Sequence, residues 1–465
     1  MDLQLFTKWY VRYVLLALCT VLLLVVPLLK GPLIGTEPFF YSRIASLHSL
    51  YDPLSFGGRF AAYPWGTGLV LSATPSVLLV VLPFLLGILS VLLVERILKH
   101  FSKDATFIYL SLLLFILSPS FIYLFSFTNS LFIAFFLSLA GFYLFIEKKF
   151  KFWVIPIVLV LPLFNLIVTG LFLLLLCFYS FFVRKDRKKL FFILLLFSIL
   201  VTGLYYGYIF YKAGLPQQID LVQGGNFHLL GSLFYDLGSA YGLSIFISLL
   251  GALGILLFWG EKYEHLFIFF SVLLFLTLAF FIPESSLVLN LFLIILAAKG
   301  FIFLAERKWT HEYYHYFILL VILSGFVFSA ISQMNTILNT EPNEAELEAI
   351  AFLAEQESGV VFSDYSKGSW ITSSGHENVM DENYVFAPDS KERLRDSQEL
   401  FASRDLNRTS ELFAKYDIRY VWIDSSMKNK LWDYDTDGLL FILQYTKSFN
   451  RIYDKDGVEI WKVSA

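Results

Sequence analysis

The sequence predicts a polytopic α-helical membrane protein that carries a C-terminal extracytoplasmic α/β domain. Of its 465 residues, 57% are hydrophobic and only 16% are charged, whereas soluble globular domains hold about 25% charged residues. The charge is also unevenly divided: residues 1–334 hold 21 basic and 14 acidic side chains, and residues 335–465 hold 14 basic and 24 acidic ones. We therefore expect a basic transmembrane domain over 1–334 and an acidic soluble domain over 335–465. This composition excludes a soluble enzyme, a disordered protein and a nucleic-acid-binding protein.

Apolar runs between charged breaks predict about eleven membrane spans, because one span needs about 20 apolar residues. Two uninterrupted stretches, 105–146 and 153–183, are too long for a single helix, and each is predicted to form a hairpin. Their turns are expected near Ser118-Pro119 and near Asn165. The predicted spans are 13–29, 69–94, 105–122, 127–146, 153–165, 167–183, 190–211, 241–259, 266–282, 286–305 and 316–334.

The distribution of Lys and Arg between loops predicts the orientation of these spans. One set of loops holds sixteen basic residues, and the alternate set holds only Lys30, Arg43, Arg59 and Lys212. Cytoplasmic loops carry the excess of positive charge, so the N-terminus is predicted to be cytoplasmic. An odd number of spans then places residues 335–465 outside, in a multi-pass integral protein of the cell membrane.

Local signals in the acidic region predict a small α/β fold. Asn343 can cap a helix over 344–356, and the runs 359–364 and 418–424 are typical of strands. Residues 452–462 are predicted to form a hairpin that turns at Gly457, since glycine adopts the positive φ such turns require.

Carboxylates are scarce on the predicted outer side of the membrane domain, so few residues there are candidates for a catalytic base or a metal ligand. Only two outer segments, 30–68 and 212–240, are long enough to build a site. Glu37 lies just beyond the first span, with Arg43 six positions later. A carboxylate there can act as a general base or metal ligand, and an Arg can bind a phosphate. The alternative is that both side chains anchor the chain at the membrane interface.

The run from Glu37 to Arg43, Glu-Pro-Phe-Phe-Tyr-Ser-Arg, resembles the first outer loop of the oligosaccharyltransferase catalytic subunit. That subunit belongs to the GT-C glycosyltransferases, membrane enzymes that use polyprenyl-phosphate-linked sugars. The resemblance implies that Glu37 matches the acid that binds a divalent metal and helps to activate the acceptor. Tyr63-Pro64 is similar to the family's entry into its second span. Residues 361–371 resemble the start of the family's soluble domain, which reads the acceptor.

The sequence departs from the family's pattern in three places. Ser126-Phe127-Thr128-Asn129-Ser130 stands where the family has a second acidic motif, and the amides of Gln223 and Asn226 stand where a Glu is expected. Asp364-Tyr365-Ser366 replaces the family's Trp-Trp-Asp, which argues against transfer to Asn in a protein sequon. Without the second acidic motif, a fully ligated divalent cation (Mg²⁺ or Mn²⁺) is in doubt, because such an ion wants several oxygen ligands.

Together these features favour a glycosyltransferase of hexosyltransferase type. It would move a sugar or oligosaccharide from a polyprenyl-phosphate-linked donor in the lipid bilayer to an extracytoplasmic acceptor protein or glycan, with Glu37 as the base and a weak candidate metal ligand. Asp52 can alternatively form a turn, and Asp236 can cap a helix. The predicted donor and substrate contacts are Arg43, Tyr41, Asp52, Tyr63, Trp65, His228 and Asp236. The predicted acceptor-side residues are Asp364, Tyr365, Lys367 and Trp370.

Two other functions stay open at this point. The missing carboxylates are also compatible with a non-catalytic GT-C relative that binds lipid-linked glycan or serves as an accessory subunit. A transporter of lipid-linked sugars is the third possibility, although the membrane segments carry almost no ionisable groups of the kind that mark transport pathways.

Overall fold

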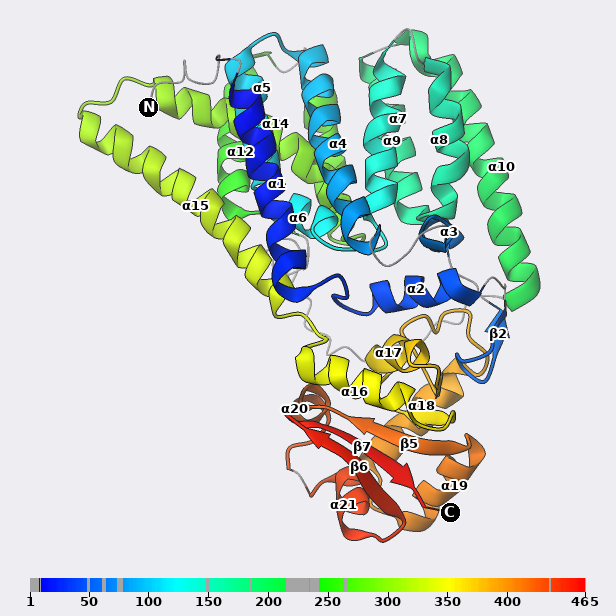
Figure 1. Ribbon diagram of the computed structural model, residues 1–465. Coiled ribbons are helices and arrows are strands. Elements are labelled where there is room, and N and C mark those ends of the chain that lie inside the picture. The colour runs from blue at the N-terminus through cyan, green and yellow to red at the C-terminus, as the bar shows by residue number, and fades with distance from the viewer. Residues whose placement is uncertain are drawn as a thin grey trace. The chain divides into compact units, whose positions relative to one another are not determined.

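The computed structural model of the chain describes residues 8, 10–47, 51–60, 64–72, 78–147, 151–183, 185–214, 234, 242–261, 266–434 and 436–464. The chain divides into two compact units (Figure 1), which we call the helical unit and the sheet unit. The helical unit comprises Met1–Pro32, Ser76–Gly203 and Gly225–Asn339, and the sheet unit comprises Leu33–Pro75, Leu204–Gly224 and Thr340–Ala465. The segment after the first helix therefore folds together with the C-terminal region.

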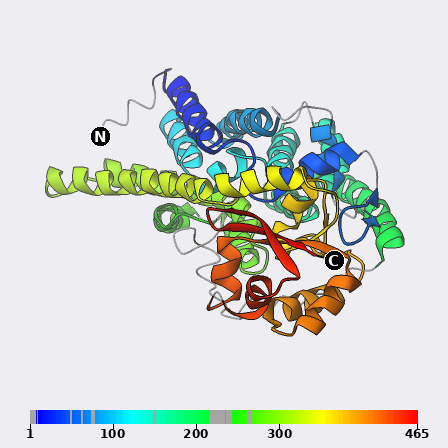
Figure 2. The ribbon, with the colours of Figure 1, turned by 60° about the horizontal axis from the view of Figure 1, so that its bottom comes forward.

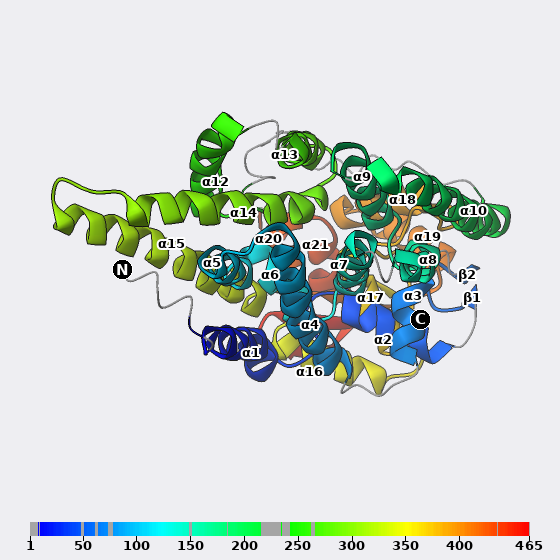
Figure 3. The same cartoon turned by 90° about the horizontal axis from the view of Figure 1, so that it is seen from above.

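The helical unit consists of apolar helices, several of which are seen close to end-on in Figure 3. Two of them approach closely because they meet at glycines: a Cβ on Gly300 of α14 would lie 2.5 Å from the carbonyl oxygen of Leu250 in α12. Small residues allow such close helix packing in membrane proteins. The helices are α1 (Val11–Lys30), α4 (Leu78–Phe101), α5 (Ala105–Ile116), α6 (Pro119–Phe125), α7 (Phe132–Ile146), α8 (Val154–Val160), α9 (Leu166–Phe182), α10 (Lys188–Ala213), α12 (Ile245–Phe258), α13 (Leu266–Ala279), α14 (Ser285–Glu306) and α15 (Glu312–Leu338). Of α10, residues up to Gly203 belong to this unit.

Each of the eleven predicted spans contains an apolar helix, but not all of these helices are long. Among the described residues, five helices are long and apolar enough to cross a membrane, and the bent pair α5–α6 would make six. Five further apolar helices are shorter, with 10–17 residues. The structure therefore supports a polytopic membrane protein, while the count of eleven spans stays a prediction.

The turn expected at Ser118-Pro119 is wrong, whereas the helix break expected near Asn165 is present. Ser118 caps a new helix, α6, which continues at an angle of 61° to α5. Proline fits the first turn of a helix, where its missing N–H costs nothing, so this pair bends the chain rather than reversing it. At Asn165 the side chain accepts a hydrogen bond from Val168 N–H at 2.9 Å and starts α9.

The sheet unit is built on a five-stranded sheet with the order β4-β3-β5-β7-β6. β3 is parallel to β4 and β5, whereas β7 is antiparallel to β5 and β6, and Figure 2 shows the β6–β7 hairpin in red. Helix α16 packs against β7, α19 against β5 and α21 against β6. The elements are α16 (Glu344–Ala354), β3 (Val360–Phe362), α17 (Gly368–Ser373), β4 (Glu377–Asn378), α18 (Ser390–Ala402), α19 (Leu406–Lys415), β5 (Ile418–Ile423), α20 (Ser425–Leu431), α21 (Gly438–Tyr445), β6 (Phe449–Lys455) and β7 (Val458–Val463).

The local predictions for this region are confirmed. Asn343 forms a capping box with Glu346 at the start of α16, and the β6–β7 turn contains Gly457 at a φ of 82°. The segment from the N-terminal half adds helix α2 (Glu37–Leu47), the strands β1 (Tyr51–Asp52) and β2 (Arg59–Phe60), and helix α3 (Trp65–Ser72). Phe39 and Phe56 of this segment belong to the same hydrophobic core as the sheet.

Candidate functional site

Glu37 is the first residue of α2 and is half-buried. The first hydrogen bond of the helix runs from Phe40 N–H to the carbonyl oxygen of Thr36 at 3.1 Å, so Glu37 lies in the first turn. Unpaired N–H groups at a helix N-terminus favour negative charge. The predicted base is therefore placed where a carboxylate is stabilised and where the negative end of a substrate can also bind.

The residues around Glu37 are held by the C-terminal region at consecutive points. Gly35 N–H donates to the carbonyl oxygen of Glu341 at 2.7 Å, and the Trp370 indole N–H donates to the carbonyl oxygen of Gly35 at 3.2 Å. The hydroxyl of Thr36 donates to Glu382 Oε2 at 2.6 Å. The ring of Phe39 lies 6.3 Å from that of Trp370. The position of the Glu37 segment is thus determined by residues more than 300 positions away in sequence.

A second anchor joins the β1–β2 hairpin to residues 378–383. Arg59 binds both carboxylate oxygens of Asp381, at 2.9 and 3.1 Å, and also the carbonyl oxygen of Asn383. Ser55 Oγ donates to Asp381 at 2.7 Å, and Phe56 N–H donates to Asn378 Oδ1 at 3.2 Å. Both side chains of the ion pair are buried. Asp381 therefore serves to fix the hairpin.

Glu382, the next residue, is a site candidate that sequence reasoning missed. Loss of hydration raises its pKa, the hydrogen bond from Thr36 opposes this, and the nearby carboxylates of Asp381 and Asp364 add to the rise. Its carboxylate binds the residue that precedes Glu37, so two carboxylates lie close to the N-terminus of α2. In the sequence, residues 379–383 (Val-Met-Asp-Glu-Asn) also resemble part of the family's soluble domain, and this resemblance is a signal that could have pointed to Glu382.

Arg43 and Asp52, both predicted substrate residues, form a buried ion pair with each other. Asp52 also accepts a hydrogen bond from Leu54 N–H at 3.1 Å, which shapes the turn after it. Arg43 lies about 9 Å along α2 from Glu37 and on another face of the helix, since six residues of helix cover that rise and turn. Within the described residues, Asp52 Oδ2 accepts no hydrogen bond, so the pair retains capacity for another polar group.

Tyr41 and Trp65, two predicted substrate residues, make packing and hydrogen-bond contacts with neighbouring helices. Tyr41 is buried on the face of α2 that also carries Glu37, and it hydrogen-bonds Thr67 of α3. Burial raises the pKa of Tyr41, and the nearby charge of Glu37 adds to the rise. Trp65 N–H donates to the hydroxyl of Tyr205 at 3.1 Å, and the two rings meet edge to face with centroids 5.4 Å apart.

The predicted acceptor-side residues have well-defined structural partners. Asp364 is buried and accepts hydrogen bonds from Ser366 N–H and Oγ at 3.0 and 2.6 Å. Tyr365 lies in a short 3₁₀ turn, beneath the ammonium of Lys430 at 5.3 Å. Trp370 is only 2% exposed and packs in the core, so its described contacts hold the Gly35 segment rather than meet solvent.

Lys367 is the centre of a buried charge network. Its ammonium pairs with Glu341 and with Asp424 at 3.2 Å, and it lies 4.4 Å from the ring centroid of Trp370. Burial alone would lower the pKa of Lys367, but the charges of Asp424 and Glu341 outweigh it and the pKa is raised. Glu341, Glu346 and Asp424 have carboxylate oxygens within 4.8 Å of one another, as a cation site requires. The Lys367 ammonium already supplies the positive charge there.

Comparison with solved structures identifies the architecture. The chain matches the oligosaccharyltransferase of Archaeoglobus fulgidus tethered to an acceptor peptide with the NVT sequon, with a TM-score of 0.63, 12% identity, and coverage of 98% of this chain and 74% of that one. The same enzyme in complex with Zn and sulfate matches with a TM-score of 0.63 and 13% identity, over 97% of this chain and 73% of that one.

The chain has the oligosaccharyltransferase fold.

A third structure, the archaeal oligosaccharyltransferase AglB from Archaeoglobus fulgidus with an inhibitory peptide and a dolichol-phosphate, matches with a TM-score of 0.51 and 12% identity, over 98% and 75% of the two chains. No family model matches the sequence, and neither does any curated protein. The resemblance to an oligosaccharyltransferase is therefore confirmed at the level of the fold. Together with the apolar helices, this fold supports a membrane protein.

Three residues of the predicted site are not among those that the structure describes. Tyr63, His228 and Asp236 lie outside the described residues. Where the family's second acidic motif is expected, the polar side chains of Thr128 and Asn129 are buried and bind backbone: Thr128 Oγ1 donates to the carbonyl oxygen of Leu79 at 2.7 Å, and Asn129 Oδ1 accepts from Leu131 and Phe132 N–H at 2.9 and 3.1 Å. These two side chains therefore stabilise the turn between α6 and α7.

Proposed function

We propose that the chain is a membrane glycosyltransferase that moves a sugar or oligosaccharide from a polyprenyl-phosphate-linked donor to an extracytoplasmic acceptor, with Glu37 as the base. The observation that supports this most is the fixation of the Glu37 segment through Gly35, Thr36 and Phe39. A general base must be held in place to be effective.

The proposed step is a single displacement with inversion at the anomeric carbon. Glu37 accepts the proton of an acceptor hydroxyl as the oxygen forms its bond to that carbon. The bond between the carbon and the phosphate oxygen breaks, and polyprenyl phosphate departs with the electron pair. The N-terminus of α2 favours negative charge beside the reacting groups.

Arg43 and Asp52 remain the proposed contacts to the donor phosphate and sugar. The guanidinium has five N–H donors, and its described hydrogen bonds involve only Asp52. It can therefore keep this ion pair and bind a phosphate oxygen as well. The aromatic side chains of Tyr41 and Trp65 are proposed to line the same region, where aromatic rings stack on sugar or prenyl chain.

If a divalent cation takes part, we propose that Glu37 and Glu382 would hold it. Mg²⁺ is commonly held by one or two carboxylates together with substrate phosphates, and the Thr36 hydrogen bond places Glu382 beside the Glu37 segment. Such an ion would neutralise charge on the leaving phosphate. The Glu341, Glu346 and Asp424 group fits an added cation less well, because Lys367 already neutralises it.

The proposed orientation follows from the loop charges. The N-terminus would be cytoplasmic, the eleven predicted spans would cross or enter the cell membrane, and the region after residue 334 would lie outside. The proposed acceptor is a hydroxyl on a protein or glycan, since Asp364, Tyr365 and Ser366 stand in place of the family's Trp-Trp-Asp.

The experiment is a transfer assay with the full chain in lipid nanodiscs. A fluorescent polyprenyl-phosphate-linked sugar is supplied with a panel of hydroxyl-bearing peptides and glycans, and the water-soluble product is separated from the lipid. We expect fluorescence to move to the soluble fraction with at least one acceptor. Donor binding without transfer to any acceptor would instead support the non-catalytic relative, and donor flux across vesicles without product would support the transporter.

A further inference from the structure

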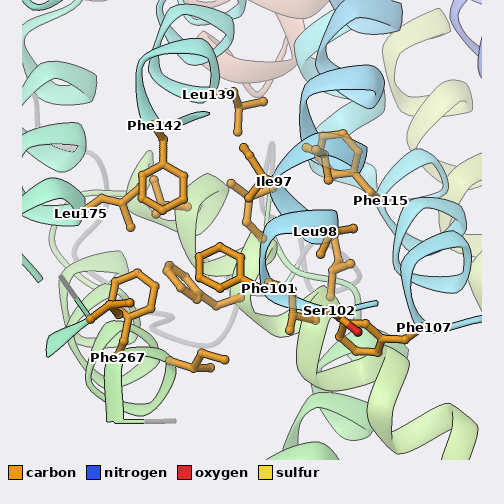
Figure 4. Close-up of a pocket in the computed structure, with 18 of the residues that line it drawn as sticks. Ile97, Leu98, Phe101, Ser102, Phe107, Phe115, Leu139, Phe142, Leu175 and Phe267 are labelled. Atoms are coloured by element: carbon orange, nitrogen blue, oxygen red, sulfur yellow. The ribbon is translucent and has the colours of Figure 1, made fainter. Parts of the chain in front are cut away.

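The helical unit contains an apolar cavity of about 580 Å³. Its lining comes from α4, α5, α7, α9, α12, α13 and α14 and consists almost wholly of Phe, Leu, Ile and Val. In Figure 4, Ile97 and Phe101 of α4 point toward the middle of this space, between Phe142 and Leu175 on one side and Phe115 on the other. Phe101 is 45% exposed, so apolar surface is left uncovered here.

The dimensions of the cavity suit a linear hydrocarbon chain. On α14 its lining residues run from Val288 to Ile302, and along α9 they run from Val168 to Val183, the residue that follows the end of the helix. Helices rise 1.5 Å per residue, so each of these stretches extends over roughly 20 Å. The volume is within the range of pockets that hold small-molecule ligands, about 300–1,000 Å³.

Polar groups gather where the lining helices end. Ser102 and Asp104 follow the end of α4, and Lys299 lies two turns before the end of α14. The ammonium of Lys299 lies 5.6 Å from the ring centroid of Phe258, and in the described part of the chain no carboxylate pairs with it. The carboxylate of Asp104 caps α5 by accepting from Thr106 N–H at 2.9 Å. Lys299 is therefore the charged group available to a ligand.

We propose that this cavity binds one acyl chain of a glycerophospholipid whose phosphate lies beside Lys299. A hydrocarbon chain would cover the apolar wall, and a basic side chain near the end of a span binds lipid phosphate. The predicted orientation puts Lys299 toward the cytoplasmic leaflet, whereas Glu37 is predicted on the outer side. The ligand is thus a resident phospholipid that fills the helical unit, and it differs from the polyprenyl donor. This inference does not depend on the proposed transfer reaction.

The test uses the full chain in nanodiscs that contain phosphatidylglycerol with a diazirine at the end of one acyl chain. After irradiation, we expect peptide mapping to place crosslinks on cavity residues such as Phe115 and Leu291. Unlabelled phosphatidylglycerol should displace the probe, and polyprenyl phosphate should not. Crosslinks confined to residues outside the lining, or displacement by polyprenyl phosphate alone, would overturn the proposal.

Two adjacent leucines of α9 provide a matched pair of variants. Leu175 lines the cavity and is buried, whereas Leu174 is exposed and does not line it. Leu175→Trp should fill the cavity and lower the crosslink yield there about tenfold, because an overpacked site rejects its ligand. Leu174→Trp should leave the yield unchanged. Equal yields from both variants would contradict the proposal.

A second pair keeps the test decisive if Leu175→Trp fails to fold. Lys299→Gln should reduce the preference for phosphatidylglycerol over neutral diacylglycerol about fivefold, the contribution expected from one basic side chain near lipid phosphate. Lys308→Gln, which removes a charge outside the lining, should not change the preference. An unchanged preference in Lys299→Gln would refute the assignment of the phosphate.

Discussion

The ion pair between Arg59 and Asp381 should control the attachment of the β1–β2 hairpin to the rest of the sheet unit. Both side chains are at most 3% exposed. Arg59→Met would leave the Asp381 carboxylate buried without its counter-charge, although Ser55 and Asn383 would still donate hydrogen bonds to it. Removing one partner of a buried pair costs about 3–5 kcal/mol. Opening of this attachment should therefore become about 10²- to 10⁴-fold more frequent.

Hydrogen exchange measures this opening directly. The amides of Phe56 and Asn378 both bond across the attachment, to Asn378 Oδ1 and to the carbonyl oxygen of Leu54 respectively, and their protection should fall by that factor in Arg59→Met. The double variant Arg59→Met/Asp381→Asn should recover part of the loss, because no charge is left buried. Arg419→Met is the control: its ion pair with Asp417 is exposed, so it should change stability by less than about 1 kcal/mol. Equal protection in Arg59→Met and wild type would refute the reasoning.

Three further predictions concern the same unit. Gly368→Ala should lower the free energy of unfolding by about 1–3 kcal/mol and the melting temperature with it, because its Cβ would lie 2.5 Å from the Asp381 Cβ; an unchanged melting curve would contradict this. Because the pKa of Glu382 is raised in the folded state, the protonated side chain stabilises the fold at low pH. This contribution is lost as the pH rises from about 4.5 through the raised pKa. The stability of Glu382→Gln, measured by urea titration, should lack this pH dependence. Lys367→Met should cost about 3–5 kcal/mol at neutral pH, measured by the same titrations. Lys367 helps to hold the pKa of Asp424 below its ordinary value, against the effect of burial. Wild type should therefore lose stability as the pH falls below about 3.8, and Lys367→Met should lose less.

Local features of the fold could be predicted from the sequence because short-range chemistry determines them. Asn343, Asn165 and Gly457 act within a few residues of their own positions as caps and as a turn. The apolar runs likewise predicted helices in the correct places. The bend at Ser118-Pro119 was misjudged because a proline can begin a helix as well as follow one.

The candidate site could be predicted only in part. Glu37 was selected as a candidate because carboxylates are scarce on its predicted side of the membrane, and its role as the base stays a prediction. The partners that position it, Trp370 and Glu382, lie 335 and 346 residues from the groups they bind, and no local pattern encodes such pairings. Trp370 was predicted to meet the acceptor, yet the structure places it in the core. Glu382 could not be distinguished from the other acidic residues of the C-terminal region by sequence alone.

The central claim is that Glu37 accepts the proton of the acceptor, and single-turnover transfer by Glu37 variants tests it most directly. Glu37→Gln retains the size of the side chain but cannot act as a base, so the rate constant for transfer should fall by about 10²- to 10⁴-fold, with donor binding retained. Glu284→Gln changes another carboxylate predicted on the outer side and should leave the rate unchanged. Transfer at the wild-type rate by Glu37→Gln would contradict the account.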